Sequence, residues 1–190
     1  DLGNLLASIH DSPGGLLDWP PPSVLPTSQR CQHGRAVDTG QEVAVIPLDE
    51  TYEGTFPFAP ETFDGSGFVQ HYVDEGPRDA EPIVLLHGEP TWGYLYRHMI
   101  GPLSEHHRVI VPDHMGFGQS ETPQERQYTL QSSTENLVAL VEHLDLSDIT
   151  FFGQDWGGPI ATAFTVRHPE RVKRMVYANS LAGYGRINDE

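Results

Sequence analysis

The sequence is poor in cysteine and lysine. Its 190 residues include a single cysteine, Cys31, and a single lysine, Lys173. One thiol cannot form a disulfide within the chain, and no group of cysteines and histidines has the spacing of zinc ligands. The chain therefore needs no oxidising compartment, and we expect a cytoplasmic protein without metal or cofactor.

Long apolar runs are also missing. No stretch of about 18 apolar residues could span a bilayer, and the chain does not start with a positive segment followed by an apolar run. The sequence therefore predicts a soluble protein with no membrane partner.

Positive charge is scarce as well. Eleven basic residues face 27 acidic ones, which gives a formal net charge of -16. Such a surface repels a phosphate backbone, so nucleic acid is not an expected partner.

Regular patterning is absent from the first part of the chain. The segment 19–22 reads Trp-Pro-Pro-Pro, and a further proline follows at Pro26. Prolines at this density exclude a regular helix or a central strand. We predict an acidic, proline-rich extension over residues 1–53, strand-like only over 42–48, followed by one core domain over residues 54–190.

Strands and helices alternate from about residue 67 onward. This rhythm is typical of an α/β fold with a mostly parallel sheet and helices on both faces. The continuous apolar runs at 82–86 and 108–112 predict strands buried on both sides, and the alternating run at 67–73 predicts a half-buried strand before a turn at 74–77. The other predicted strands cover residues 149–152 and 172–178, and the predicted helices cover 92–103, with Trp92, Leu95, Tyr96 and Met99 on one side, 129–144 and 159–168.

Three loops follow predicted parallel strands directly. They span residues 87–92, 113–120 and 154–158. Ligands of open α/β sheets bind beyond the carboxyl ends of the strands, so we expect these loops to converge in space.

The last of these loops contains the pattern Gly153-x-Asp155-x-Gly157. This is the spacing of a nucleophile elbow, a sharp strand-to-helix turn that lifts its central side chain above the sheet, with aspartate where serine is usual. An ordinary turn with a solvated aspartate, or an aspartate that caps the next helix, is the alternative.

Taken together and in order, the motifs HGEPTW (87–92), DHMGFGQS (113–120) and GQDWGG (153–158) resemble those of haloalkane dehalogenases, a family of the α/β-hydrolase superfamily. The resemblance covers residues 56–180 and is to the subgroup with glutamate in the first motif. It implies the amino-terminal part of the α/β-hydrolase fold, truncated before the cap and the last strands.

The resemblance implies a halogenated alkane and water as the reactants. Such a substrate offers an sp3 carbon and no carbonyl, so a carboxylate suits it better than a serine. Asp155 would displace the halide and form an alkyl ester, which water then cleaves.

Two further residues would assist Asp155 in this family. The indole N–H of Trp156 would stabilise the departing halide, and the backbone N–H groups of Trp156 and Glu89 would form the oxyanion hole. The Glu89 side chain would hold water or a neighbouring donor, because a carboxylate repels halide. Trp92 could line the substrate pocket, although a packing role fits it equally well.

The histidines of the sequence are not expected to act as the base. The resemblance implies that His87 supports the oxyanion loop, while His114 and His168 are interpreted as loop or helix-end residues, as are the neighbours at 106–107. Asp113 is interpreted as a carboxylate that orders its loop.

Two elements of such an enzyme are missing from these 190 residues. A histidine base with its acid, and a helical cap, would lie beyond Glu190, and Asn179 cannot supply the acid that some relatives carry there. We expect either a piece of a longer protein, whose carboxy-terminal portion completes the site, or a truncated homologue without turnover.

Two other functions remain open on the sequence. An epoxide hydrolase also uses an elbow aspartate, but it typically has histidine where Gln154 stands. A non-catalytic interaction module would explain the missing base and the acidic extension.

Overall fold

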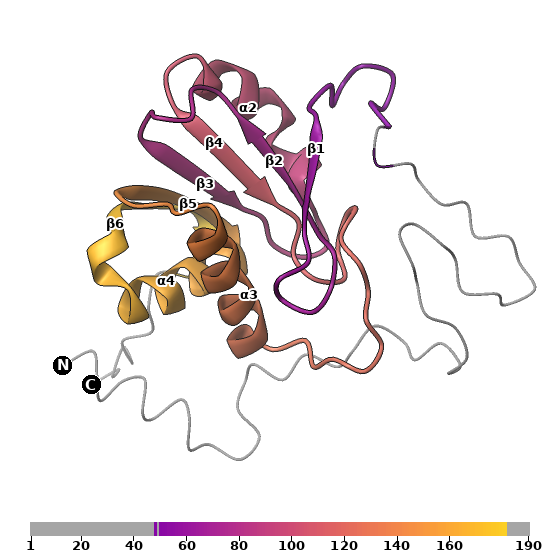
Figure 1. Cartoon of the computed structure of the whole chain (residues 1–190), viewed down its shortest axis with the longest axis vertical. Helices are drawn as coiled ribbons and strands as arrows, with labels where there is room; N and C mark the ends of the chain where they lie inside the picture. Colours follow the sequence, from indigo (N-terminus) through magenta and orange to yellow (C-terminus); the bar gives the residue numbers. More distant parts are fainter. Residues whose placement is uncertain (1–47, 49, 182–190) are drawn as a thin grey trace, which may run out of the picture.

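The computed structural model describes Leu48 and residues 50–181 (Figure 1). The extension predicted over residues 1–53, the strand predicted at 42–48 and Cys31 lie almost entirely outside the described residues. The described strands are β1 (Pro60–Phe63), β2 (Gln70–Glu75), β3 (Pro82–Leu86), β4 (Arg108–Pro112), β5 (Ile149–Asp155) and β6 (Val172–Ser180), and the helices are α2 (Arg97–Ser104), α3 (Leu130–His143) and α4 (Gly157–Arg167), with short 3-10 turns η1 (Gly93–Tyr96) and η2 (Pro169–Arg171).

The strands form one sheet in the order β1-β2-β4-β3-β5-β6. The four strands β4, β3, β5 and β6 are parallel to one another, whereas β1 and β2 are antiparallel additions at one side. The predicted mostly parallel α/β fold is therefore confirmed. The chain leaves β3 toward β4 and then returns to the other side of β3 as β5, so the direction of winding reverses between β3 and β5, where ligands bind in open sheets.

Helices pack on both faces of this sheet (Figure 1). On one face α3 and α4 cover Val84, Leu86 and Phe151, and on the other α2 and η1 cover Leu85 and Val109. Successive buried residues of β3 therefore point to opposite faces of the sheet, as expected for a strand that is covered on both sides.

The predictions for β3 and β4 are confirmed to the residue, but that for the first strand is wrong in two respects. The strand β2 begins at Gln70 and runs through Asp74, which was assigned to a turn, and it is buried on both faces. Its neighbours β1 and β4 lie on either side of it, and β1 was not predicted at all. The polar residues Gln70 and His71 suggest a strand that is partly exposed to solvent, but both side chains are buried.

The helix predicted over residues 92–103 is divided in the structure. It begins with η1 and continues as α2, which contains Pro102 and ends at Ser104. Leu95 is exposed, while Tyr96 and Ile100 are buried. The predicted apolar side is therefore only partly right, because the 3-10 turn changes which residues face the sheet.

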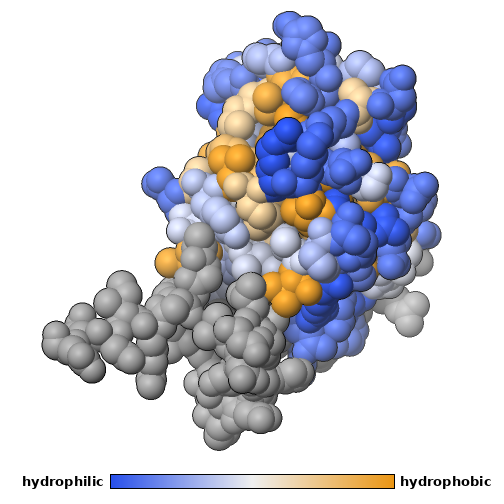
Figure 2. All heavy atoms as spheres, turned by 90° about the vertical axis from the view of Figure 1, so that its left-hand side faces the viewer, coloured by the Kyte–Doolittle hydropathy of each residue, from blue (hydrophilic) through white to orange (hydrophobic). Residues whose placement is uncertain are grey.

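Apolar side chains remain exposed on β6, the strand at one edge of the sheet, and directly after it. Val176 and Leu181 are 43% and 51% exposed. Figure 2, which views the molecule from the side where β6 lies in Figure 1, shows apolar surface within a largely hydrophilic face.

A capping box starts α3. The hydroxyl of Thr129 accepts a hydrogen bond from the Ser132 N–H at 3.1 Å, and the Ser132 hydroxyl accepts one from the Thr129 N–H at 3.0 Å. Both bonds satisfy donors that a helix end leaves without partners.

Replacing Thr129 by alanine should lower the free energy of unfolding by about 1 kcal/mol, because the Ser132 N–H at the start of α3 loses its acceptor. Urea denaturation followed by circular dichroism measures this loss. Thr129→Ser keeps the acceptor and should restore most of the stability, so an equal loss in both variants would contradict the capping role.

Candidate active site

Asp155 ends β5 with a left-handed backbone, at φ 51°. This conformation is uncommon for residues other than glycine, and it turns the chain sharply into α4. The turn is possible because of the glycines around it: a Cβ on Gly157 would lie 2.0 Å from the Leu86 carbonyl oxygen, and one on Gly153 would lie 2.7 Å from the Gly158 backbone. The strained strand-to-helix turn predicted from the spacing of these glycines is present.

The carboxylate of Asp155 faces the loop that follows β3. Its Oδ1 accepts a hydrogen bond from the Glu89 backbone N–H at 3.1 Å. The approach is close, since a Cβ on Gly88 would lie 2.3 Å from the Asp155 Cβ. The predicted convergence of these two loops is confirmed, and it places a backbone donor on the carboxylate.

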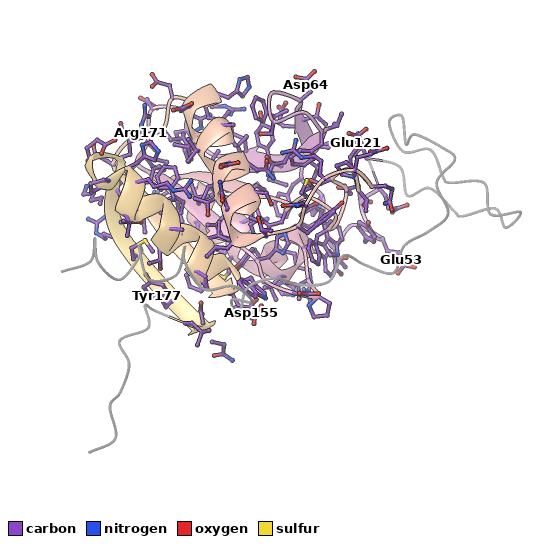
Figure 3. The ribbon with its side chains drawn as sticks, turned by 90° about the horizontal axis from the view of Figure 1, so that it is seen from below. Glu53, Asp64, Glu121, Asp155, Arg171 and Tyr177 are labelled. Atoms are coloured by element: carbon purple, nitrogen blue, oxygen red, sulfur yellow. The ribbon has the colours of Figure 1, made fainter. Side chains whose placement is uncertain are left out.

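The backbone of Asp155 is also held from β6. The Ser180 hydroxyl donates to the Asp155 carbonyl oxygen at 2.6 Å. Figure 3 shows Asp155 at one end of the strands and Arg171, which precedes β6, at the far end. The elbow therefore lies at the carboxyl edge of the parallel strands, as predicted.

His87 connects the first loop to the second. Its Nδ1 donates to the Gly88 carbonyl and its Nε2 accepts from the His114 N–H, both at 2.9 Å. The Nε2 of His114 donates in return to the His87 carbonyl oxygen at 2.9 Å. Both rings are buried, so these histidines brace the loop of Glu89 and do not contact Asp155 through a hydrogen bond.

Burial lowers the pKa of both braced histidines. The pKa of His114 lies well below its usual value because of its burial and because of the nearby His87. Burial likewise lowers the pKa of His87, with Asp113 and the Gly88 carbonyl opposing it. Both rings are therefore neutral at pH 7.

Acid should consequently destabilise the fold through His114. A histidine with a lowered pKa in the folded state stabilises the protein above its unfolded pKa, and this stabilisation is lost as the pH falls below about 6.5 toward the folded pKa. The free energy of unfolding should fall by about 1.4 kcal/mol per pH unit for this residue.

Urea unfolding at several pH values between 7.5 and 5 measures that slope. His114→Gln keeps a side-chain donor and should flatten it, whereas His98→Gln removes an exposed histidine of α2 and should leave it unchanged. Identical slopes in the two variants would contradict this assignment.

Asp113 orders the second loop from a fully buried position. Its Oδ1 accepts from the Gly93 N–H at 2.7 Å, and its Oδ2 accepts from the Gln119 N–H at 2.9 Å and lies 2.9 Å from the His71 Nδ1. The loop-ordering role predicted for Asp113 agrees with these contacts. Sequence analysis missed His71, and its only signal was a polar residue within an apolar strand.

A pocket of about 160 Å³ opens beside the elbow. Its lining is mainly apolar and comes from all three predicted loops and from the start of α3. The lining residues are Gly88, Glu89, His114, Met115, Gly116, Phe117, Tyr128, Thr129, Leu130, Ser133, Trp156 and Ile160.

Only some of the predicted site residues line this pocket. Glu89 and Trp156 line it, next to Asp155. Trp92 is not among the lining residues: its ring stacks on Tyr94 at 5.5 Å and lies 5.3 Å from the ring of Phe56. The structure therefore shows Trp92 in an aromatic cluster at the start of η1.

The Glu89 side chain has a raised pKa, first because of its burial and second because of the Asp155 carboxylate. Two acidic groups thus share this end of the sheet. Within Leu48 and residues 50–181 no group of three or more His, Cys, Asp or Glu side chains could hold a metal ion, and no helix could cross a membrane.

The chain matches a family model described as alpha/beta hydrolase fold over residues 81–189. A haloalkane dehalogenase of Mycolicibacterium paratuberculosis is 52% identical over 113 residues, which are 58% of this chain and 38% of that protein. A cis-3-alkyl-4-alkyloxetan-2-one decarboxylase of Xanthomonas campestris is 43% identical over 141 residues, which are 70% of this chain and 47% of that protein.

Solved structures of a haloalkane dehalogenase and an epoxide hydrolase are also similar to this chain. The haloalkane dehalogenase DpaA of Paraglaciecola agarilytica, described as tetrameric, aligns with a TM-score of 0.65 at 39% identity, over 70% of this chain and 46% of that one. The epoxide hydrolase CorEH aligns with a TM-score of 0.62 at 31% identity, over 70% of this chain and 46% of that one. The chain thus spans less than half the length of these relatives.

Proposed function

Since the chain belongs to the alpha/beta hydrolase fold family and is most similar to haloalkane dehalogenases among the relatives described above, we propose that it is the nucleophile-bearing part of a hydrolytic dehalogenase acting on small halogenated alkanes. The observation that supports this best is the elbow aspartate, whose carboxylate receives the Glu89 N–H at 3.1 Å beside a mainly apolar pocket.

In the first step an Asp155 carboxylate oxygen attacks the carbon that bears the halogen. The C–O bond forms as the carbon–halogen bond breaks, and the halide leaves with the electron pair, so no proton moves. The indole N–H of Trp156, which lines the pocket, would donate to the halide as its charge grows.

In the second step water attacks the carbonyl carbon of the ester. The Glu89 N–H already lies on one oxygen of the carboxyl group, where it would stabilise the oxyanion. A base must take the proton of the water, and within the described residues no histidine is hydrogen-bonded to Asp155. Turnover would therefore need a base from another part of the protein.

Two neighbouring activities are the alternatives. The likeness to an epoxide hydrolase favours attack of the same aspartate on an epoxide carbon, and the likeness to an oxetanone decarboxylase favours a strained lactone. Both reactions need a group that receives or stabilises an oxygen leaving group. Gln154, Trp156 and Glu89 together favour the dehalogenase: an indole N–H suits a halide, epoxide hydrolases typically have histidine where Gln154 stands, and Glu89 matches the glutamate subgroup of dehalogenases.

Stoichiometric alkylation tests the proposal without requiring turnover. Incubation with 1,2-dibromoethane should release one bromide per chain and add a 2-bromoethyl group to the peptide containing Asp155, as seen by mass spectrometry. Styrene oxide should give little or no ester at this residue. Ester formation with the epoxide alone would instead establish the epoxide hydrolase.

A further inference from the structure

The acidic groups at the pocket have no basic partner. Glu89 lines the pocket, its N–H donates to the carboxylate of the adjacent Asp155, and no arginine or lysine is among the lining residues. The remaining titratable groups of the lining are His114, which burial keeps neutral, and Tyr128, whose pKa burial raises to about 12.

The positive side chains of the described region lie elsewhere. Five lie where the parallel strands begin, at the opposite edge of the sheet from Asp155, two contact aromatic rings, and Arg167 lies in the last turn of α4. The ion pairs and hydrogen bonds join Arg78 and Arg108 to Asp74, Arg171 to the Leu146 carbonyl, and Lys173 and Arg174 to Glu81, while Arg97 lies over Tyr94 and Arg126 over Phe68.

Backbone groups stabilise the negative charge of Asp155 but not that of the Glu89 side chain. Asp155 stands at the start of α4, where the helix dipole favours negative charge, and it receives the Glu89 N–H. No hydrogen bond or ion pair of the described residues involves the Glu89 carboxyl, and its side chain is partly buried beside a mainly apolar lining. The negative charge of the Glu89 carboxylate therefore acts on any molecule that enters the pocket.

We propose that Glu89 is a specificity-determining residue that makes this pocket reject organic anions and admit neutral molecules of the same shape. This inference rests on the proposed dehalogenase function and narrows its substrate class, because it excludes haloalkanoates. An anion placed beside Asp155 meets the second negative charge of Glu89 in a partly desolvated site, which weakens its binding by about tenfold to a hundredfold.

Two isosteric alkylating agents test this selection. Bromoacetamide and bromoacetate differ in charge and hardly in size, and mass spectrometry measures the rate at which each esterifies Asp155 in a Cys31→Ser background, which removes the competing thiol. Glu89→Gln keeps the backbone N–H and the size of the side chain. The preference for bromoacetamide should fall at least tenfold in Glu89→Gln, and comparing the two proteins cancels the intrinsic reactivities.

The control is Glu135→Gln, which removes one exposed negative charge from α3 and should keep the wild-type preference. Bromide binding provides a second readout that needs no reaction: quenching of the tryptophan fluorescence, to which Trp156 contributes, should show about tenfold tighter binding in Glu89→Gln.

An unchanged preference together with unchanged bromide affinity would overturn the inference. Absence of any ester at Asp155, with bromide affinity raised in Glu89→Gln, would refute the proposed dehalogenation and leave the charge selection standing. The two failures are thus distinguishable.

Discussion

Asp155→Asn should abolish ester formation and bromide release from 1,2-dibromoethane, with a loss of about a thousandfold or more. An amide oxygen is a poor nucleophile, and no other described carboxylate has both the elbow backbone and a donor from the Glu89 loop. Asparagine tolerates a left-handed backbone, so the variant should fold.

Asp148→Asn is the matched control for this experiment. Asp148 is an exposed aspartate with φ 54° that directly precedes the other end of β5. It undergoes the same chemical change on a similar backbone, and bromide release should stay at the wild-type rate. A loss of release in both variants, or in neither, would mean that Asp155 is not the nucleophile.

Much of this site could be predicted from short-range patterns. The apolar runs that form β3 and β4 are typical of strands covered on both sides, and each leads directly into a glycine-containing loop. Parallel strands bring such loops to one edge. The glycines at 153 and 157 reveal the elbow because a side chain at either position would collide with backbone.

The part that escaped prediction depends on long-range contacts between polar groups. His71 and Gln70 lie in a strand whose alternation suggests an exposed face, yet both are buried because their partners come from residue 113 onward. Trp92 belongs to the same motif as Glu89, but it packs on an aromatic cluster that includes Tyr52. Neither arrangement leaves a periodic signal in the sequence.

The network around Asp113 predicts the largest loss of stability. Its two carboxylate oxygens face the Gly93 N–H on one side, and the Gln119 N–H and the His71 ring on the other, in a fully buried position. In Asp113→Asn the amide NH2 must face donors in either orientation, so at least one buried donor loses its acceptor and meets another donor. The free energy of unfolding should fall by about 3 to 5 kcal/mol.

Urea denaturation measures this effect, with Asp64→Asn as the control because Asp64 is exposed in the loop after β1. The control should change stability by less than about 0.5 kcal/mol. Because the segment held by Asp113 continues into His114 and the pocket lining, the folded fraction of Asp113→Asn should also alkylate more slowly at Asp155. A stable variant with wild-type alkylation would show that the loop is held by its backbone contacts and His87 alone, and that the Asp113 carboxylate contributes little to positioning the site.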